Sequence, residues 1–217
     1  EFPLHQELRS AKIYEYMLDR AFVPHDAIVH PNGLIYTVDQ ALDHMAVTDP
    51  ATGQTTYYPQ ADGRAMEYRK GFSSADQEVV GEFNPETLEW EPSYFIDAET
   101  GANYPHTIRV DAQGIVWFTL AGSEHVGRLD PETGSIDILD LPAAESGGIS
   151  GGTQPYGIDI SPVDDRMWYG RLFGDRIGTV DPETLEITEY DSPVRGPRRM
   201  RFDDEGVLWV TGYSEGE

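Results

Sequence analysis

Apolar and polar residues alternate along this chain in short segments, and turn residues separate the segments at regular intervals. The pattern is fullest in residues 105–139, where apolar stretches lie at 108–110, 115–119, 126–129 and 136–139. Alternation over about five residues between turn sequences is typical of short β-strands. We therefore expect an all-β chain with four strands in each repeating unit.

The unit recurs in register. Each copy opens with Pro, continues into an aromatic-rich strand, and most copies then reach a Val-Gly or Ile-Gly strand and an Asp-Pro turn. The step from Pro24 to Asp49 equals the step from Pro105 to Asp130. The four aligned copies open at Pro24, Pro105, Pro155 and Pro197. Repetition of this length predicts a radial or linear array of units.

The copies give approximate repeat boundaries for one domain over 1–217. The predicted repeats are 1–23 (partial), 24–58, 59–104 (degenerate), 105–154, 155–196 and 197–217 (partial). The degenerate repeat is recognisable only by its second half, around 80–90, and its first half, near 61–74, does not align. At the front, residues 12–16 match the last strand of a repeat at 186–190. Because the sequence starts and ends inside repeats, we expect a fragment of a longer chain.

Four strands in each unit of roughly forty to fifty residues are typical of β-propeller blades, and about five blade equivalents are present. A solenoid would show helices or shorter periods, and a sandwich would not keep register across repeats. The aromatic residues in register on the second strands are expected to pack blade against blade. They are Tyr36, Trp117, Trp168 and Trp209.

The charge is strongly acidic, with 39 Asp and Glu against 15 Lys and Arg and a net charge of −24. Such a surface repels phosphate backbones, so nucleic acid is not an expected partner. The acidic surface with few lysines fits adaptation to salt or an ordinary acidic propeller. The absence of cysteine excludes disulfides and thiolate metal sites. No hydrophobic stretch approaches membrane-spanning length, and a periplasmic or secreted location is favoured over a cytoplasmic one.

The motifs resemble the blade consensus of the virginiamycin B lyase (streptogramin lyase) family. They are Pro-His/Tyr-x-Ile, Asp-x-x-Gly-x-Val-Trp-Phe-Thr, Ile-Gly-x-Val-Asp-Pro-Glu-Thr and Ile-Thr-Glu-Tyr, clearest over 105–211. The resemblance implies seven blades and an Mg²⁺-dependent lyase that opens a cyclic depsipeptide by elimination at its ester. Residues 197–199 are also similar to larger bacterial proteins that carry such propellers beside other modules. The motifs themselves are mainly structural.

Elimination of this kind needs a base and a group that stabilises the developing enolate. The resemblance implies that histidine and glutamate at the mouth of the central channel supply these roles. His25 and His106 match the Pro-His of the family repeat and are the predicted general bases, since histidine titrates near neutrality. Tyr156 and Arg198 take the same position in the other two aligned copies. Alternatively, each histidine only bonds to a neighbouring blade.

The chain departs from the family at the position after Trp-Phe-Thr, where the family often has Glu. We align Val38, Leu120, Arg171 and Gly212 with this position, and none of them is Glu. The copies present therefore lack that carboxylate, which weakens the lyase prediction and leaves the metal ligands unknown.

Arginines at aligned positions predict a cationic channel mouth. Together with Tyr156, the predicted ligand-binding residues are Arg109, Arg171, Arg198 and Arg201. A guanidinium fork binds a carboxylate with two hydrogen bonds, so the expected ligand is a small anion. The alternative is that these arginines form salt bridges with neighbouring aspartates such as Asp159 and Asp203.

Three functions follow. The first is a lyase acting on a cyclic or ester-linked metabolite, with Mg²⁺ implied by the resemblance. The second is a non-enzymatic propeller that binds a small anionic ligand or a protein partner. The third is a gluconolactonase-like hydrolase with a central metal, for which no aligned set of inward Glu and Asn is visible.

His44 and His125 share a register and are expected to tie blades together or face solvent, although a metal could also draw them together.

Overall fold

The computed structural model describes residues 14–18, 23–39, 44–59, 78–145 and 152–214. Apart from one short 3₁₀ turn, η4 (Ala98–Thr100), the regular structure in these residues is β. The chain forms two compact units, Glu1–Ser73 with Gly81–Pro92, and Ser74–Val80 with Ser93–Glu217. The all-β prediction is confirmed, while the closed ring, the number of blades and the single domain stay predictions.

The first unit contains a four-stranded antiparallel sheet in chain order. Its strands are β1 (Pro24–Val29), β2 (Ile35–Asp39), β3 (His44–Thr48) and β4 (Thr55–Pro59). A short hairpin follows, made of β6 (Phe83–Asn84) and β7 (Glu89–Trp90).

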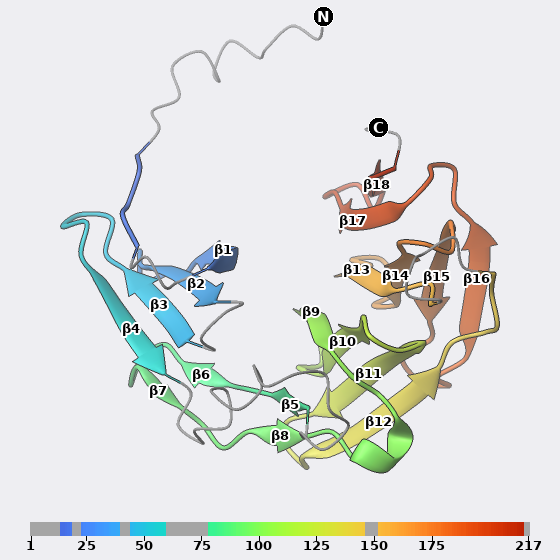
Figure 1. Cartoon of the computed structure of the whole chain (residues 1–217), viewed down its shortest axis with the longest axis horizontal. Coiled ribbons are helices and arrows are strands. Elements are labelled where there is room, and N and C mark those ends of the chain that lie inside the picture. The colour runs from blue at the N-terminus through green and yellow to red at the C-terminus, as the bar shows by residue number, and fades with distance from the viewer. Residues whose placement is uncertain (1–13, 19–22, 40–43, 60–77, 146–151, 215–217) are drawn as a thin grey trace, which may run out of the picture. The chain divides into compact units, whose positions relative to one another are not determined.

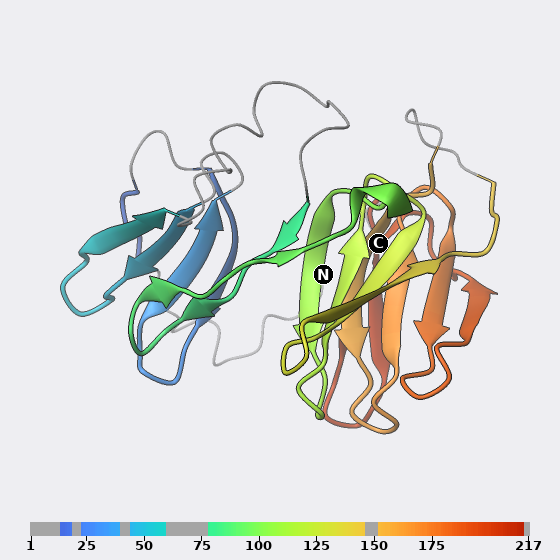
Figure 2. The same cartoon turned by 90° about the horizontal axis from the view of Figure 1, so that it is seen from below.

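The second unit contains two four-stranded antiparallel sheets and two two-stranded ones (Figures 1 and 2). The strands of the first four-stranded sheet are β9 (Pro105–Val110), β10 (Val116–Leu120), β11 (His125–Asp130) and β12 (Ser135–Asp140). The second consists of β13 (Pro155–Ile160), β14 (Met167–Arg171), β15 (Arg176–Val180) and β16 (Ile187–Asp191). The paired strands are β17 (Pro197–Phe202) with β18 (Leu208–Gly212), and β5 (Val79–Val80) with β8 (Tyr94–Phe95).

Each aligned repeat begins its first strand at the opening Pro, at β1, β9, β13 and β17. The degenerate repeat differs, because its described part forms only two-residue strands, and most of its unaligned half lies in 60–77, outside the described residues. The predicted strand at 12–16 is wrong over its described part: residues 14–16 have no regular structure. Tyr16 instead donates a hydrogen bond from its hydroxyl to the carbonyl of Pro50 at 3.3 Å.

The Asp-x-x-Gly-x-Val-Trp motif is one hydrogen-bonded unit. One carboxylate oxygen of Asp111 accepts from the backbone N–H groups of Gln113 and Ile115, and the other accepts from the indole N–H of Trp117 at 2.8 Å. Asp203 makes the equivalent bond to Trp209 at 2.7 Å, and this bond holds the pKa of Asp203 below its usual value. The motif therefore links the first turn to the second strand.

The glycine of the third strand makes room for an aromatic ring. A Cβ atom on Gly127 would lie 2.1 Å from Cζ of Phe118, and one on Gly178 would lie 2.2 Å from Cζ of Tyr169. Both rings come from the neighbouring second strand, in directly paired positions. In the first unit the corresponding pair is Thr37 and Ala46. Where the second strand has an aromatic residue, the third strand therefore has Gly opposite it, and where the second strand has the smaller Thr37, the third strand has Ala.

Two apolar clusters cover the two faces of the β9–β12 sheet. Trp117 and Val126 pack with Ile158 and Tyr169 of the β13–β16 sheet, while Phe118 and Leu129 pack with residues of the β5–β8 region. Tyr36 and Trp117 are buried, as expected for core aromatics. The expectation is wrong for Trp209, which is 65% exposed because its sheet has only two strands among the described residues.

None of the helical structure among the described residues is long and apolar enough to span a membrane.

Candidate functional site

The first strands of the three repeats in the second unit, β9, β13 and β17, lie next to one another (Figure 1). They bring the residues that follow the opening prolines into contact. The rings of His106 and Tyr156 have centroids 3.8 Å apart, and Nη2 of Arg198 donates a hydrogen bond to the Tyr156 hydroxyl at 3.2 Å. We call His106, Tyr156 and Arg198 the post-proline row.

The threonine of Trp-Phe-Thr positions this row. The Thr119 hydroxyl accepts from the backbone N–H of Thr107 at 3.2 Å and donates to the carbonyl of Tyr156 at 2.8 Å. Thr119 is fully buried, and it lies where the pairing of β9 with β10 shifts register. Its hydroxyl therefore fills an irregularity in one sheet and ties that sheet to the neighbouring strand β13.

The surroundings of the row are aromatic and cationic. The ring of Tyr104 lies 5.9 Å from that of His106, and Nδ1 of His106 is 2.9 Å from the Thr107 hydroxyl. Cζ of Arg198 lies 4.5 Å from the ring centre of Tyr213. The hydrogen bond to Tyr156 raises the pKa of Arg198 above its usual value, so the guanidinium stays charged.

A second aligned position forms an ion-paired bridge across the same strands. Asp159 accepts from Nε of Arg109 at 3.3 Å, and Nη1 of Arg201 lies 3.5 Å from the same carboxylate oxygen. The other oxygen accepts from the backbone N–H of Phe202 at 2.8 Å. For Arg109 and Arg201 the structure thus shows salt bridging, the alternative weighed from the sequence.

Arg171 lies in the interior instead of at an open surface, with a side chain that is 1% exposed. Its guanidinium donates to Glu189 at 2.7 Å, to the Thr153 hydroxyl at 2.6 Å and to the carbonyl of Pro142 at 2.7 Å, and it also pairs with Glu124. These protein groups already occupy it, so in this arrangement it is not available to a ligand.

The pKa values of two groups near Arg171 are shifted by burial and by their hydrogen bonds. Burial disfavours ionisation of Glu124, but hydrogen bonds from Thr153 and the pairing with Arg171 outweigh burial and lower its pKa below the usual value. This stabilisation is present above the pKa of the unfolded carboxyl and is lost as the pH falls through the lower folded value. Burial, and then the hydrogen bond to Glu189, raise the pKa of the Tyr169 hydroxyl, which therefore stays a donor.

The other predicted histidines are not drawn into a metal cluster. Nδ1 of His25, in the first unit, lies 3.2 Å from the carboxylate of Asp26, and Nε2 of His125 lies 2.9 Å from that of Asp140. Within the described ranges, no group of three or more His, Asp or Glu residues could hold a metal ion. The Mg²⁺ that the resemblance implies therefore stays a prediction.

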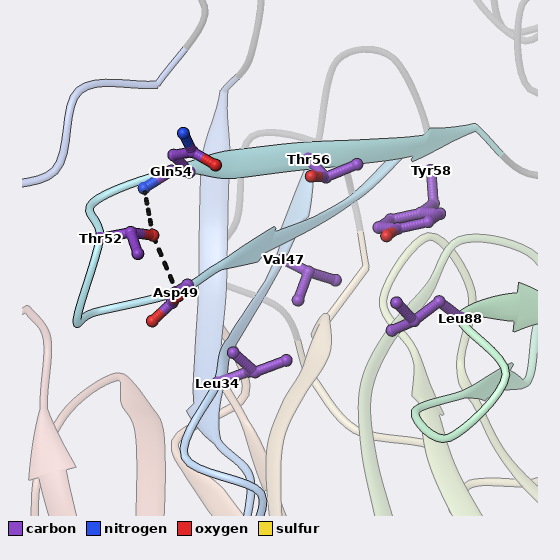
Figure 3. Close-up of a pocket in the computed structure, with 8 residues that line it drawn as sticks. All are labelled: Leu34, Val47, Asp49, Thr52, Gln54, Thr56, Tyr58 and Leu88. Atoms are coloured by element: carbon purple, nitrogen blue, oxygen red, sulfur yellow. Dashed lines mark hydrogen bonds between the residues drawn. The ribbon is translucent and has the colours of Figure 1, made fainter.

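A pocket of about 210 Å³ lies in the first unit (Figure 3). Its lining residues are Leu34, Val47, Asp49, Thr52, Gln54, Thr56, Tyr58 and Leu88. Figure 3 shows that its carboxylate, on Asp49, accepts from the Thr52 hydroxyl within the β3–β4 turn. The carboxylate also accepts from the backbone N–H of Ala51 at 2.8 Å, so it serves the turn.

A scan against models of known protein families finds no match. A curated relative, the virginiamycin B lyase of Nocardia farcinica, is 30% identical over 133 residues, which are 61% of this chain and 39% of the relative. The resemblance to virginiamycin B lyase is confirmed. The match spans about two fifths of that lyase, so the activity of a whole virginiamycin B lyase comes to this chain only as a proposal.

Solved structures agree on the fold. A streptogramin B lyase structure has a TM-score of 0.51 at 19% identity, covering 91% of this chain and 79% of that chain. The extracellular domain of a protein assigned to a hybrid two-component system of B. thetaiotaomicron has a TM-score of 0.60 at 14% identity, covering 92% of this chain and 28% of that chain. At such identities these similarities show the fold alone.

The virginiamycin B lyase motifs led to the row but not to all its neighbours. Tyr213 was not predicted. It lies four residues after Trp209, and the residues four after Trp117 and Trp168 are Ala121 and Leu172. Both of these pack beside Tyr156. An aromatic residue where other copies have Ala or Leu was the available signal. The bridging role of Asp159 was foreseen as an alternative, whereas the partners of Arg171 were not.

Proposed function

We propose that this chain is part of a virginiamycin B lyase-like propeller that binds an ester-bearing small molecule at the post-proline row, and that His106 is its general base. The observation that supports this most directly is the contact between His106, Tyr156 and Arg198, which come from three successive repeats. The named relative supports the class of reaction.

The proposed reaction is an elimination. The imidazole of His106 takes a proton from the carbon next to a carbonyl, a carbon–carbon double bond forms, and the carbon–oxygen bond of the ester breaks. The electron pair of that bond leaves with the oxygen, so the product is a free carboxylate. Arg198 and the Tyr156 hydroxyl supply a positive charge and a hydrogen bond for the negative charge that develops, as such a step requires.

The test is a turnover assay on the whole chain with a panel of cyclic esters and depsipeptides, in buffers with and without Mg²⁺. Elimination is followed by the absorbance of the new conjugated double bond. We expect His106→Ala to lower turnover about 10²- to 10⁴-fold, the contribution typical of a positioned general base. His125→Gln, at a histidine outside the row, serves as the control and should keep its activity. Full activity of His106→Ala would exclude His106 as the base.

A second function, ligand binding without catalysis, is favoured by one observation. The position after Trp-Phe-Thr holds Leu120, Arg171 and Gly212 in the second unit, and none of these is a carboxylate. The alignment of Val38 with this position is wrong, because the strand pairing puts Asp39 opposite the opening Pro24, as Leu120 lies opposite Pro105. If no ester is turned over, but a compound binds to the wild-type chain and not to a Tyr156→Ala variant, recognition replaces catalysis as the function.

A further inference from the structure

We propose that Arg198, flanked by Tyr156 and Tyr213, binds the carboxylate group of the ligand. We call these three residues the Arg198 clamp. The inference rests on the proposed function, because it names the chemical group that the post-proline row recognises.

Among the described residues, no carboxylate forms an ion pair with Arg198. Arg109 and Arg201 share Asp159, and Arg171 pairs with two glutamates. Arg198 instead contacts the Tyr156 hydroxyl and two aromatic rings, at 5.1 Å and 4.5 Å from their centres. Its Nε is buried, with no hydrogen-bond partner among the described residues. A cation held by neutral groups can still attract an anion.

The strands around the clamp increase this attraction. β9, β13 and β17 together carry four arginines and one aspartate, in a chain whose net charge is −24. A local positive charge on an acidic protein is selective, because an anionic ligand is repelled elsewhere on the surface and attracted here. The arrangement favours an organic anion over a neutral or cationic ligand.

The clamp is also held in place before any ligand binds. Gly157 lets β13 and β17 approach closely, since a Cβ atom there would lie 2.3 Å from the carbonyl oxygen of Arg198. The backbone N–H of Tyr213 donates to the carbonyl of Gly196 at 2.9 Å, and Tyr156 is only 8% exposed. A guanidinium fork that is already positioned loses less entropy when it binds a planar carboxylate with two hydrogen bonds.

The proposed reaction supplies such a group. Elimination at an ester releases a carboxylate, and Tyr156 connects the base His106 directly to Arg198. The leaving oxygen would therefore gain its charge within reach of the clamp. One guanidinium with a single charge suits a carboxylate better than a phosphate, which usually gathers several donors.

The test is a calorimetric titration of the whole chain with benzoate, with benzamide as the neutral analogue and inorganic phosphate as the other oxyanion. We expect the dissociation constant of benzoate to be at least about ten-fold lower than that of either other probe, as a charged hydrogen-bonding partner should give. Arg198→Gln should weaken benzoate binding about ten-fold or more. Arg176→Gln, at an arginine that is 39% exposed and pairs with Asp191, should leave it unchanged.

Circular dichroism and the thermal midpoint establish that Arg198→Gln is folded. If it is not, Tyr213→Leu at the exposed ring tests the same clamp and should weaken benzoate binding several-fold. Benzoate binding that survives both substitutions, equal binding of benzamide or phosphate, or no benzoate binding at all would overturn the proposal. Because binding of a carboxylate needs no base, benzoate binding that is lost in Arg198→Gln supports the clamp even where no ester is eliminated, so the two proposals can fail separately.

Discussion

Replacing Arg171 with Leu should destabilise the protein by about 3–5 kcal/mol, the usual loss when one partner of a buried ion pair is removed. The Glu189 carboxylate is 6% exposed and would remain without its cation. The Thr153 hydroxyl and the Pro142 carbonyl would each lose the guanidinium as a partner. Urea denaturation, followed by tryptophan fluorescence, measures the change in the free energy of unfolding.

Arg176→Leu is the matched control for this prediction. Arg176 also lies in the β13–β16 sheet, but it is 39% exposed, and its partner Asp191 is 91% exposed. Exposed pairs contribute little, so we expect a change within about 0.5 kcal/mol. Equal losses in the two variants would mean that Arg171 is not buried and paired as described.

Replacing Trp117 with Ala should cost about 3–5 kcal/mol, as for other large aromatic residues removed from a core. Trp117 is fully buried between two sheets, and its indole N–H occupies one oxygen of Asp111. The loss therefore combines a cavity with an unpaired carboxylate oxygen. Thermal and urea denaturation of the variant measure it.

Trp209→Ala separates these two contributions. Trp209 makes the same bond to Asp203, at 2.7 Å, but it is 65% exposed. We expect Trp209→Ala to be much less destabilising than Trp117→Ala, because it removes an exposed hydrogen bond and leaves no cavity. A loss as large as that of Trp117→Ala would show that Trp209 is buried in solution, and would contradict the exposed second strand of this sheet.

The strand boundaries could be predicted because the repeat carries its own local chemistry. Asp111 and Trp117 form one hydrogen-bonded unit, and Gly127 faces Phe118. These interactions lie within one sheet and recur at fixed spacing, so aligned copies reveal them. The degenerate repeat lacks them, and its described strands are only two residues long.

The candidate site could be predicted only in part. Alignment of His106, Tyr156 and Arg198 was sufficient to expect them at equivalent places, and in the structure they touch. The same alignment put Arg171 with the ligand-binding arginines, because its partners, Glu124 and Glu189, lie 47 and 18 residues away. Glu189 belongs to the Ile-Thr-Glu-Tyr motif, but the motif alone does not show which cation that Glu pairs with. A buried arginine and an exposed one look the same in a sequence until their partners are known.

The most direct test of the account is where a ligand binds. We would add benzoate to the isotopically labelled chain and record the NMR signals of the His106 imidazole and the Arg198 guanidinium, together with the methyl signals of Leu34 and Val47 in the pocket of the first unit. We expect the His106 and Arg198 signals to shift together and saturate at one concentration, while the two methyl signals stay in place. Shifts confined to Leu34 and Val47 would contradict it, since the ligand would then bind away from the post-proline row.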